Sequence, residues 1–267
     1  MTVKQCATHH LAALLAALAV LGACSRGESV QRFTPQREPV TLRTPDTGSR
    51  LRVAQAAESS GQTDVALSMY GAAAAAEPGR PELQAAFAGA LARAGNVAEA
   101  EEVLQRALAR SPGDPVLMLT IGRLRLRTGA AEEALAQFDH VLARSPRLAP
   151  ALDGRGVALD LLGRHAEAQA SYRAALVESP GSVNLANNLA ISLLLDGRAE
   201  EARAMLEPLA RRGTVPARVR TNLAVARAAT GDEAGARTLL GEQANGLDLR
   251  AIGAGFVGAA PMAAASR

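Results

Sequence analysis

Apolar and polar positions along this chain repeat with a period of 34 residues. In each period an apolar segment with helical spacing is followed by a glycine, and then by a second helical segment that stops before a proline. In one period these parts are Val116–Leu126, Gly129, Glu132–Arg144 and Pro146. Glycine accepts the left-handed backbone that ends a helix, and the residue before a proline disfavours helical geometry. The pattern therefore predicts two helices per period.

Several kinds of position keep this register. The glycines are Gly61, Gly95, Gly129, Gly163, Gly197 and Gly231; alanines follow at Ala66, Ala100, Ala134, Ala168, Ala202 and Ala236; large side chains follow at Tyr70, Leu104, Phe138, Tyr172, Leu206 and Leu240; small residues recur at Ala54, Ala88, Gly122, Gly156, Ala190 and Ala224. Small residues let helices approach closely, and large ones fill the space between them. A helix pair this short buries its apolar face only by stacking on neighbours. We therefore expect an all-α array of about six helix-turn-helix units at residues 49–250.

The order and spacing of these residues resemble the tetratricopeptide repeat (TPR) family, over about three quarters of the chain. The resemblance implies a right-handed superhelical solenoid that binds protein segments. The fifth unit departs from the pattern, because Gly213, Thr214 and Pro216 replace its closing proline. Residues 251–267 carry no repeat pattern and are expected to form a C-terminal tail, either a short capping turn or a loose end.

The N-terminus has the features of a secretory signal. Lys4 precedes the apolar run Leu11–Leu21, which is too short to span a bilayer. The run ends in Leu-Gly-Ala-Cys at Cys24 and resembles a bacterial lipobox, which implies removal of residues 1–23 and lipidation of Cys24; an ordinary signal peptide with a chance cysteine is the alternative. Ser25 after the cysteine favours the outer membrane by the same resemblance. Residues 24–48 are poor in apolar side chains and are expected to form a flexible tether.

The amino-acid composition argues against several classes of function. Cys6 would leave with the signal and Cys24 would carry lipid, so no thiol would remain for a metal, a disulfide or a nucleophile. The chain has two tyrosines, four phenylalanines, no tryptophan and a formal net charge of only +3. Single-stranded nucleic acids are bound by stacking aromatics above basic grooves. We therefore expect no nucleic-acid partner, no metal and no cofactor.

Three features of the sequence are typical of enzymes, but each is better explained by a structural role. Gly253, Gly255 and Gly258 spell a dinucleotide-binding motif, but no strand precedes them. His140 and His165 lie in different repeats and are expected at the surface or in helix packing. Paired glutamates such as Glu101 and Glu102, or Glu132 and Glu133, begin second helices, where the helix dipole favours acids. The sequence therefore predicts a binding protein and not an enzyme.

The resemblance to TPR proteins implies that the first helices of successive units line a concave groove. Polar residues on these helices are therefore candidates for contact with a bound protein segment. The peptide-groove candidates are Arg123, Arg127, Asn187, Asn188 and Asn222. Asparagine satisfies both donors and acceptors of a bound backbone, and arginine binds carboxylates in a bidentate manner. The alternative is that the asparagines face water or cap locally. Further exposed candidates are Arg52, Gln55, Arg93, Asp153, Asp160 and Arg218, and an apolar floor is expected from Val157, Ile191, Leu194 and Val225.

The segment Asn187–Asp232 differs from a generic repeat. Pro208 stands within a second helix, where it removes a hydrogen bond and is expected to cause a kink. This segment resembles the TadD lipoproteins of the tight-adherence (Flp) pilus. The resemblance implies an outer-membrane, periplasm-facing scaffold or pilotin that binds the pilus secretin or another pilus component. An adaptor for peptidoglycan hydrolases and a general outer-membrane chaperone remain as alternatives.

Overall fold

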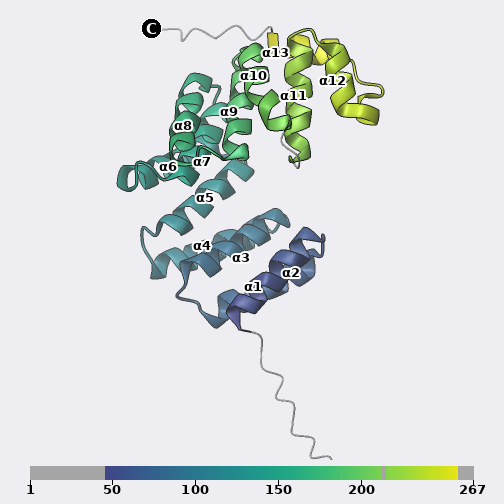
Figure 1. Ribbon diagram of the computed structural model, residues 1–267. Helices are drawn as coiled ribbons and strands as arrows, with labels where there is room; N and C mark the ends of the chain where they lie inside the picture. The colour runs from purple at the N-terminus through teal and green to yellow at the C-terminus, as the bar shows by residue number, and fades with distance from the viewer. Residues whose placement is uncertain (1–45, 212–214, 258–267) are drawn as a thin grey trace, which may run out of the picture. The chain divides into compact units, whose positions relative to one another are not determined.

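The computed structural model describes residues 46–211 and 215–257, and its regular structure within those ranges is entirely helical (Figure 1). The first helices of the six units are α1 (Thr47–Ser59), α3 (Pro81–Arg93), α5 (Pro115–Arg127), α7 (Ala149–Leu161), α9 (Val183–Leu195) and α11 (Ala217–Ala229). The second helices are α2 (Thr63–Ala76), α4 (Val97–Arg110), α6 (Ala131–Arg144), α8 (His165–Glu178), α10 (Ala199–Ala210) and α12 (Glu233–Leu240). The predicted all-α fold with two helices per period is confirmed.

The periodic glycines form the turns between paired helices. All six have a positive φ, between 73° at Gly61 and 90° at Gly95. A side chain is strained in that left-handed conformation, which explains why glycine recurs there. Each turn lets the second helix fold back directly against the first.

Small and large residues complement each other inside each unit. The alanines of the second helices are buried, and Phe138 and Tyr172 are among the largest fully buried side chains. Phe138 lies against Gly122 so closely that a Cβ there would be 2.7 Å from the ring. Tyr172 and Gly156 make the equivalent contact one repeat later. Glycine on the facing helix therefore accommodates these two rings, whereas Ala54 occupies the equivalent position opposite Tyr70, and alanine faces leucine in several other units.

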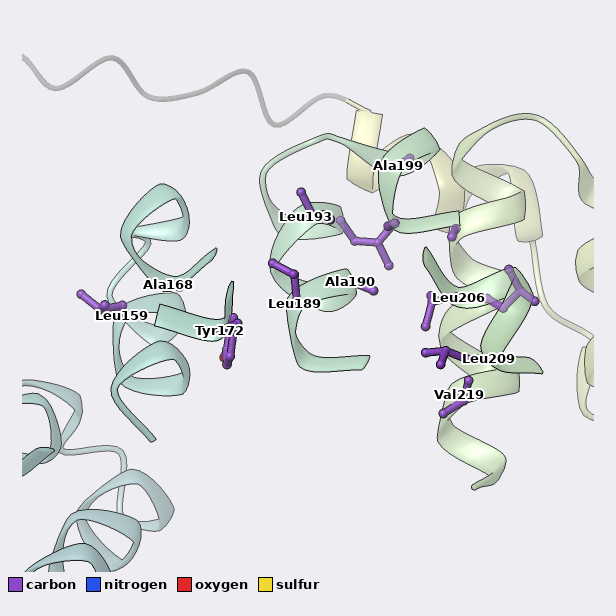
Figure 2. Close-up of a cluster of buried hydrophobic side chains, with 14 residues drawn as sticks. Leu159, Ala168, Tyr172, Leu189, Ala190, Leu193, Ala199, Leu206, Leu209 and Val219 are labelled. Atoms are coloured by element: carbon purple, nitrogen blue, oxygen red, sulfur yellow. The ribbon is translucent and has the colours of Figure 1, made fainter. Parts of the chain in front are cut away.

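The core is shared between units. One cluster combines Leu159 of α7, Tyr172 of α8 and Leu189 of α9 with residues of α10 and α11 (Figure 2). Leu206 and Val219 close the cluster on the side of the sixth unit. Because the apolar faces of one pair are covered by the next, the units stabilise one another, as expected for a stacked array.

The C-terminal units depart from the regular pattern. α10 has 12 residues, against 14 in α2, α4, α6 and α8, and continues through Pro208. α12 has only 8 residues and is followed by the 3-10 helix Gly241–Ala244. The helix α13 (Leu249–Val257) then packs against α11. A Cβ at Gly253 would lie 2.3 Å from the carbonyl oxygen of Ala228, so this glycine permits close packing of the two helices.

Two predicted boundaries differ from the described helices. α1 begins at Thr47, within the predicted tether, because the side chain of Asp46 accepts a hydrogen bond from the backbone of Ser49 and caps the helix. α13 includes the start of the predicted tail. The signal segment, Cys24 and most of the tether lie outside the described residues. No helix in residues 46–211 or 215–257 is long and apolar enough to cross a membrane.

Candidate protein-binding groove

A groove of about 700 Å³ lies between the first helices of the first four units. Residues of α1, α3, α5 and α7 line it, together with Tyr70 of α2 and Leu104 of α4. Pockets that hold small ligands enclose about 300–1,000 Å³. The volume is therefore sufficient for several side chains of a bound segment.

The larger aliphatic side chains of the groove lining come mainly from α5 and α7, while α3 contributes alanines. Val116 and Leu126 lie on α5, and Val157 and Leu161 on α7. Leu161 is 59% exposed, which leaves most of a leucine side chain available for contact. Val157 was among the residues predicted for the groove, whereas Leu161 was not, although it follows Arg127 by one period.

The expectation of an apolar floor was wrong at Leu194. This side chain is buried in the cluster that joins α7 to α11, where it packs against neighbouring core residues. Val157, Ile191 and Val225 are partly buried, and of these three Val157 lines the groove. These three residues occupy equivalent positions in α7, α9 and α11, and a continuous apolar floor beyond Val157 stays a prediction.

The two predicted groove arginines lie in the groove but in different environments. Arg127 donates hydrogen bonds to the carbonyl oxygens of Ala92 and Arg93, at 2.7 and 3.3 Å, and so binds the last turn of α3. The neighbouring Arg125 pairs with acids of α4 and α6, whereas Arg123 is exposed and has no acidic partner at salt-bridge distance among the described residues. Arg123 is therefore the arginine most available to a ligand carboxylate.

The predicted asparagines lie on α9 and α11, outside the groove lining. Asn187 was expected to be exposed but is 1% exposed, and its side-chain oxygen accepts a hydrogen bond of 2.8 Å from the side-chain amide of Asn222. Asn188 donates a hydrogen bond of 2.9 Å to Asp153. The expectation of exposure is thus wrong for Asn187, since packing of α11 against α9 covers it. Contact of Asn188 or Asn222 with a bound peptide stays a prediction.

These asparagine contacts belong to a series of bonds between successive first helices. Asn188 and Asn222 each bond a residue 35 positions earlier, and Arg93 pairs with Glu58 at the same separation. Arg218 donates to Asn184 of the preceding unit. Such bonds hold neighbouring units in register, and we call them the inter-repeat bonds. The spacing of the two asparagines by one repeat therefore has a structural role.

Asp153 connects the groove to these bonds. Burial raises the pKa of its carboxyl group, while the hydrogen bond from Asn188 and the positive charge of Arg123 act in the opposite direction. The net shift is upward, so burial outweighs the two favourable interactions. The charge of Arg123 thus acts on Asp153 without a direct ion pair.

A second polar cluster lies between α7, α8 and α9. Asp160 accepts hydrogen bonds from Ser192 at 2.7 Å and from Tyr172 at 3.1 Å, and its carboxylate lies 2.9 Å from Nδ1 of His165. Burial and the Asp160 charge both raise the pKa of Tyr172. Serine, histidine and aspartate lie together here, as in a catalytic triad. Ser192 and His165 both hydrogen-bond to the carboxylate of Asp160, however, so the histidine is not placed to accept the proton of the serine hydroxyl. Ser192 is also 0% exposed.

The histidines are consistent with their expected structural roles. His165 packs at the start of α8 beside Asp160, and His140 is exposed on α6. No group of three or more potential metal-ligating side chains converges in the part of the chain that the structure describes. The geometry of the groove, with arginines beside exposed aliphatic side chains, suits contact with a polypeptide.

Comparisons with known proteins agree with this architecture. A family model described as the tetratricopeptide repeat matches residues 57–108, 94–152 and 161–221. No curated protein sequence matches the chain.

Solved structures share the fold at low sequence identity. A thermophilic TPR protein of Thermus thermophilus is 24% identical, with a TM-score of 0.61, and the match covers 67% of this chain and 98% of that one. PilW, described as a widely conserved type IV pilus biogenesis factor, is 20% identical with a TM-score of 0.62, covering 74% and 93%. PilF of Pseudomonas aeruginosa is 17% identical with a TM-score of 0.58, covering 75% and 93%.

Proposed function

Because this chain belongs to the tetratricopeptide repeat family, we propose that it is a protein-binding scaffold of the pilus machinery, anchored by lipid to the outer membrane and facing the periplasm. Its partner in this proposal is the secretin or another component of a tight-adherence (Flp) pilus. It acts by binding and without catalysis. The TPR fold and its role in protein interaction are the premise; the pilus, the partner and the location are the proposal.

The groove is the observation that carries the proposal. Arg123 is exposed beside Val157 and Leu161 within the same volume of about 700 Å³. Aliphatic side chains stabilise a complex by removing apolar surface from water, and an arginine fixes orientation by charge-assisted hydrogen bonds. This combination suits a polypeptide segment better than a small polar metabolite.

Two further observations support the specific partner and location. PilW, whose fold this chain shares over 93% of the length of that protein, is described as a type IV pilus biogenesis factor. The Leu-Gly-Ala-Cys sequence at Cys24 resembles a lipobox and favours a membrane anchor. A tether between Cys24 and the first helix would let the repeats reach a partner away from the membrane surface.

The first experiment tests the anchor. We expect Cys24→Ser to shift the chain from the outer-membrane fraction to the soluble periplasmic fraction, and to reduce secretin assembly into its multimer. Fractionation and immunoblotting of the secretin multimer measure both effects. Normal secretin assembly with a fully soluble Cys24→Ser chain would contradict the anchored role.

The second experiment tests the groove. We expect Arg123→Gln combined with Leu161→Ser to reduce co-isolation of the secretin after cross-linking in cells. The matched control combines Arg220→Gln with Val177→Ser, since both side chains are exposed and neither lines the groove. Equal recovery of secretin with the groove variant and the control variant would show that the groove does not bind it.

A further inference from the structure

The groove-facing positions of the first helices change character between the third and fourth units. One position reads Arg93, Arg127, Leu161 and Leu195 in successive units, and a second reads Arg123, Val157, Ile191 and Val225. Both rows pass from arginine to an aliphatic residue between α5 and α7. The groove therefore has a basic part followed along the array by an apolar part.

The structure shows that the two parts meet in one site. Arg93, Arg123 and Arg127 line the groove together with Val157 and Leu161. Glu82 is the single acidic side chain in the lining, and Arg93 pairs with Glu58 beside it. Arg123 and Arg127 have no acidic partner at salt-bridge distance among the described residues, so the basic part keeps an excess of positive charge. Its continuation toward α9 has an exposed aliphatic side chain at Leu195, which is 37% exposed.

We propose that the occupant of this groove is a partner segment in which carboxylates stand next to a run of aliphatic residues. Its carboxylates lie over Arg93, Arg123 and Arg127, and its aliphatic side chains lie over Val157 and Leu161 toward Leu195. The proposal rests on the proposed protein-binding function and specifies the chemistry of the partner. Charge complementarity selects acids at one end of the segment, and burial of apolar surface selects aliphatic residues at the other.

The chain's own ends lack this chemistry. The residues between the lipobox and the first helix carry one more basic than acidic side chain: Arg26, Arg32, Arg37 and Arg43 against Glu28, Glu38 and Asp46. Residues 258–267 contain no acidic side chain. A positively charged segment would be repelled by the arginine rows, so the complementary segment belongs to another protein.

A panel of synthetic peptides tests the proposal with the full-length chain in lipid nanodiscs, and empty nanodiscs give the background. The first peptide joins a block of aspartate and glutamate to a block of leucine and isoleucine. In the second, asparagine and glutamine replace the acids; in the third, serine replaces the aliphatic residues. Fluorescence anisotropy measures each Kd.

We expect the first peptide to bind at least about tenfold more tightly than either of the others, since a charge-assisted contact is typically worth a factor of about ten. Arg123→Gln should remove most of the preference for acids over amides, and Leu161→Ser most of the preference for aliphatic residues over serine. Arg220→Gln and Val177→Ser serve as the matched controls and should leave both preferences intact. Higher salt should weaken the acidic peptide more than the amide peptide.

Equal Kd values for the acidic and amide peptides, or a preference that Arg123→Gln leaves unchanged, would overturn this inference. Those results would leave open the binding of secretin through other contacts. Conversely, absence of secretin from the cross-linked complex would refute the proposed function while the peptide preference stood. The two sets of measurements therefore separate the partner's chemistry from its identity.

Discussion

Gly156 of α7 lies directly against the ring of Tyr172 on α8, where a Cβ would be 2.5 Å from Cε1 of the tyrosine. The ring is almost fully buried and its hydroxyl donates to Asp160. The aromatic residue thus occupies space that only glycine leaves open. Packing and hydrogen bonding together fix the position of the ring.

Gly156→Ala is expected to destabilise the protein by about 1–3 kcal/mol, because overpacking forces the ring or the helices to move. Urea unfolding followed by circular dichroism measures the change. Gly181→Ala is the matched control, since a Cβ at that turn glycine meets no heavy atom within 4 Å. Similar losses for the two variants would show that the close contact between Gly156 and Tyr172 is unimportant.

Asp160→Ala is expected to destabilise the protein by about 2–4 kcal/mol, since a buried hydroxyl left without an acceptor costs about 1–3 kcal/mol. The variant removes the shared acceptor of Ser192 and Tyr172. Ser192→Ala removes one donor and leaves the other interactions in place, so its effect should be clearly smaller. Thermal unfolding of both variants under one buffer checks the order, and a larger loss for Ser192→Ala would contradict it.

Asp153 should make the stability depend on pH. Because the folded-state pKa is raised above 3.8, the folded protein binds more protons than the unfolded chain between the two values, and stability falls as the pH rises through that window. Asp153→Asn keeps an acceptor for Asn188 and removes the charge. We expect this variant to lose the corresponding part of the pH dependence, measured as melting temperature across an acidic pH series.

Arg123→Gln provides the complementary test for Asp153. The positive charge of Arg123 lowers the pKa of Asp153, so its removal should raise that pKa further and move the stability window to higher pH. The double variant Arg123→Gln with Asp153→Asn should show no such movement. If the pH range over which stability falls still moved in the double variant, the movement would come from a titratable group other than Asp153.

Gly253→Ala is expected to detach α13 from α11, because a Cβ would lie 2.3 Å from a backbone oxygen of Ala228. Hydrogen exchange should become faster in Leu249–Val257 and remain unchanged in α7 and α9. Gly255→Ala is the control on the same helix, since its Cβ meets nothing within 4 Å. That change should stabilise the helix slightly, by up to about 1 kcal/mol. Faster exchange in the Gly255→Ala variant alone would contradict this account.

Much of the fold followed from the sequence because the repeat is locally encoded. A glycine with positive φ follows each first helix, and a proline stands two residues after the end of α2, α4, α6 and α8, so these helix boundaries depend on nearby residues. The final helix was harder to foresee. α13 is short and rich in glycine and alanine. The role of Gly253, which is to allow close packing on α11, is visible only when the two helices are in contact.

The candidate site was less predictable for a related reason. The period shows that Asn188 and Asn222 occupy equivalent positions, but it does not show that each bonds the preceding helix. Burial of Asn187 depends on how closely α11 packs, which no local pattern encodes. Leu161 could have been predicted as a groove residue, because the 34-residue period aligns it with Arg127. A single leucine at an exposed position is common, however, and does not by itself indicate a binding site.

The inter-repeat bonds have a mechanical consequence for the groove. Side-chain bonds join α1 to α3, α3 to α5, α7 to α9, and α9 to α11. In the described residues no such bond joins α5 to α7, where Arg123 and Asp153 interact only through their charges. Widening the array at this junction breaks no side-chain hydrogen bond between first helices, whereas widening at the other junctions does. At the step where the groove lining changes from cationic to aliphatic, the described first helices are therefore held together by packing and charge, without a side-chain hydrogen bond between them.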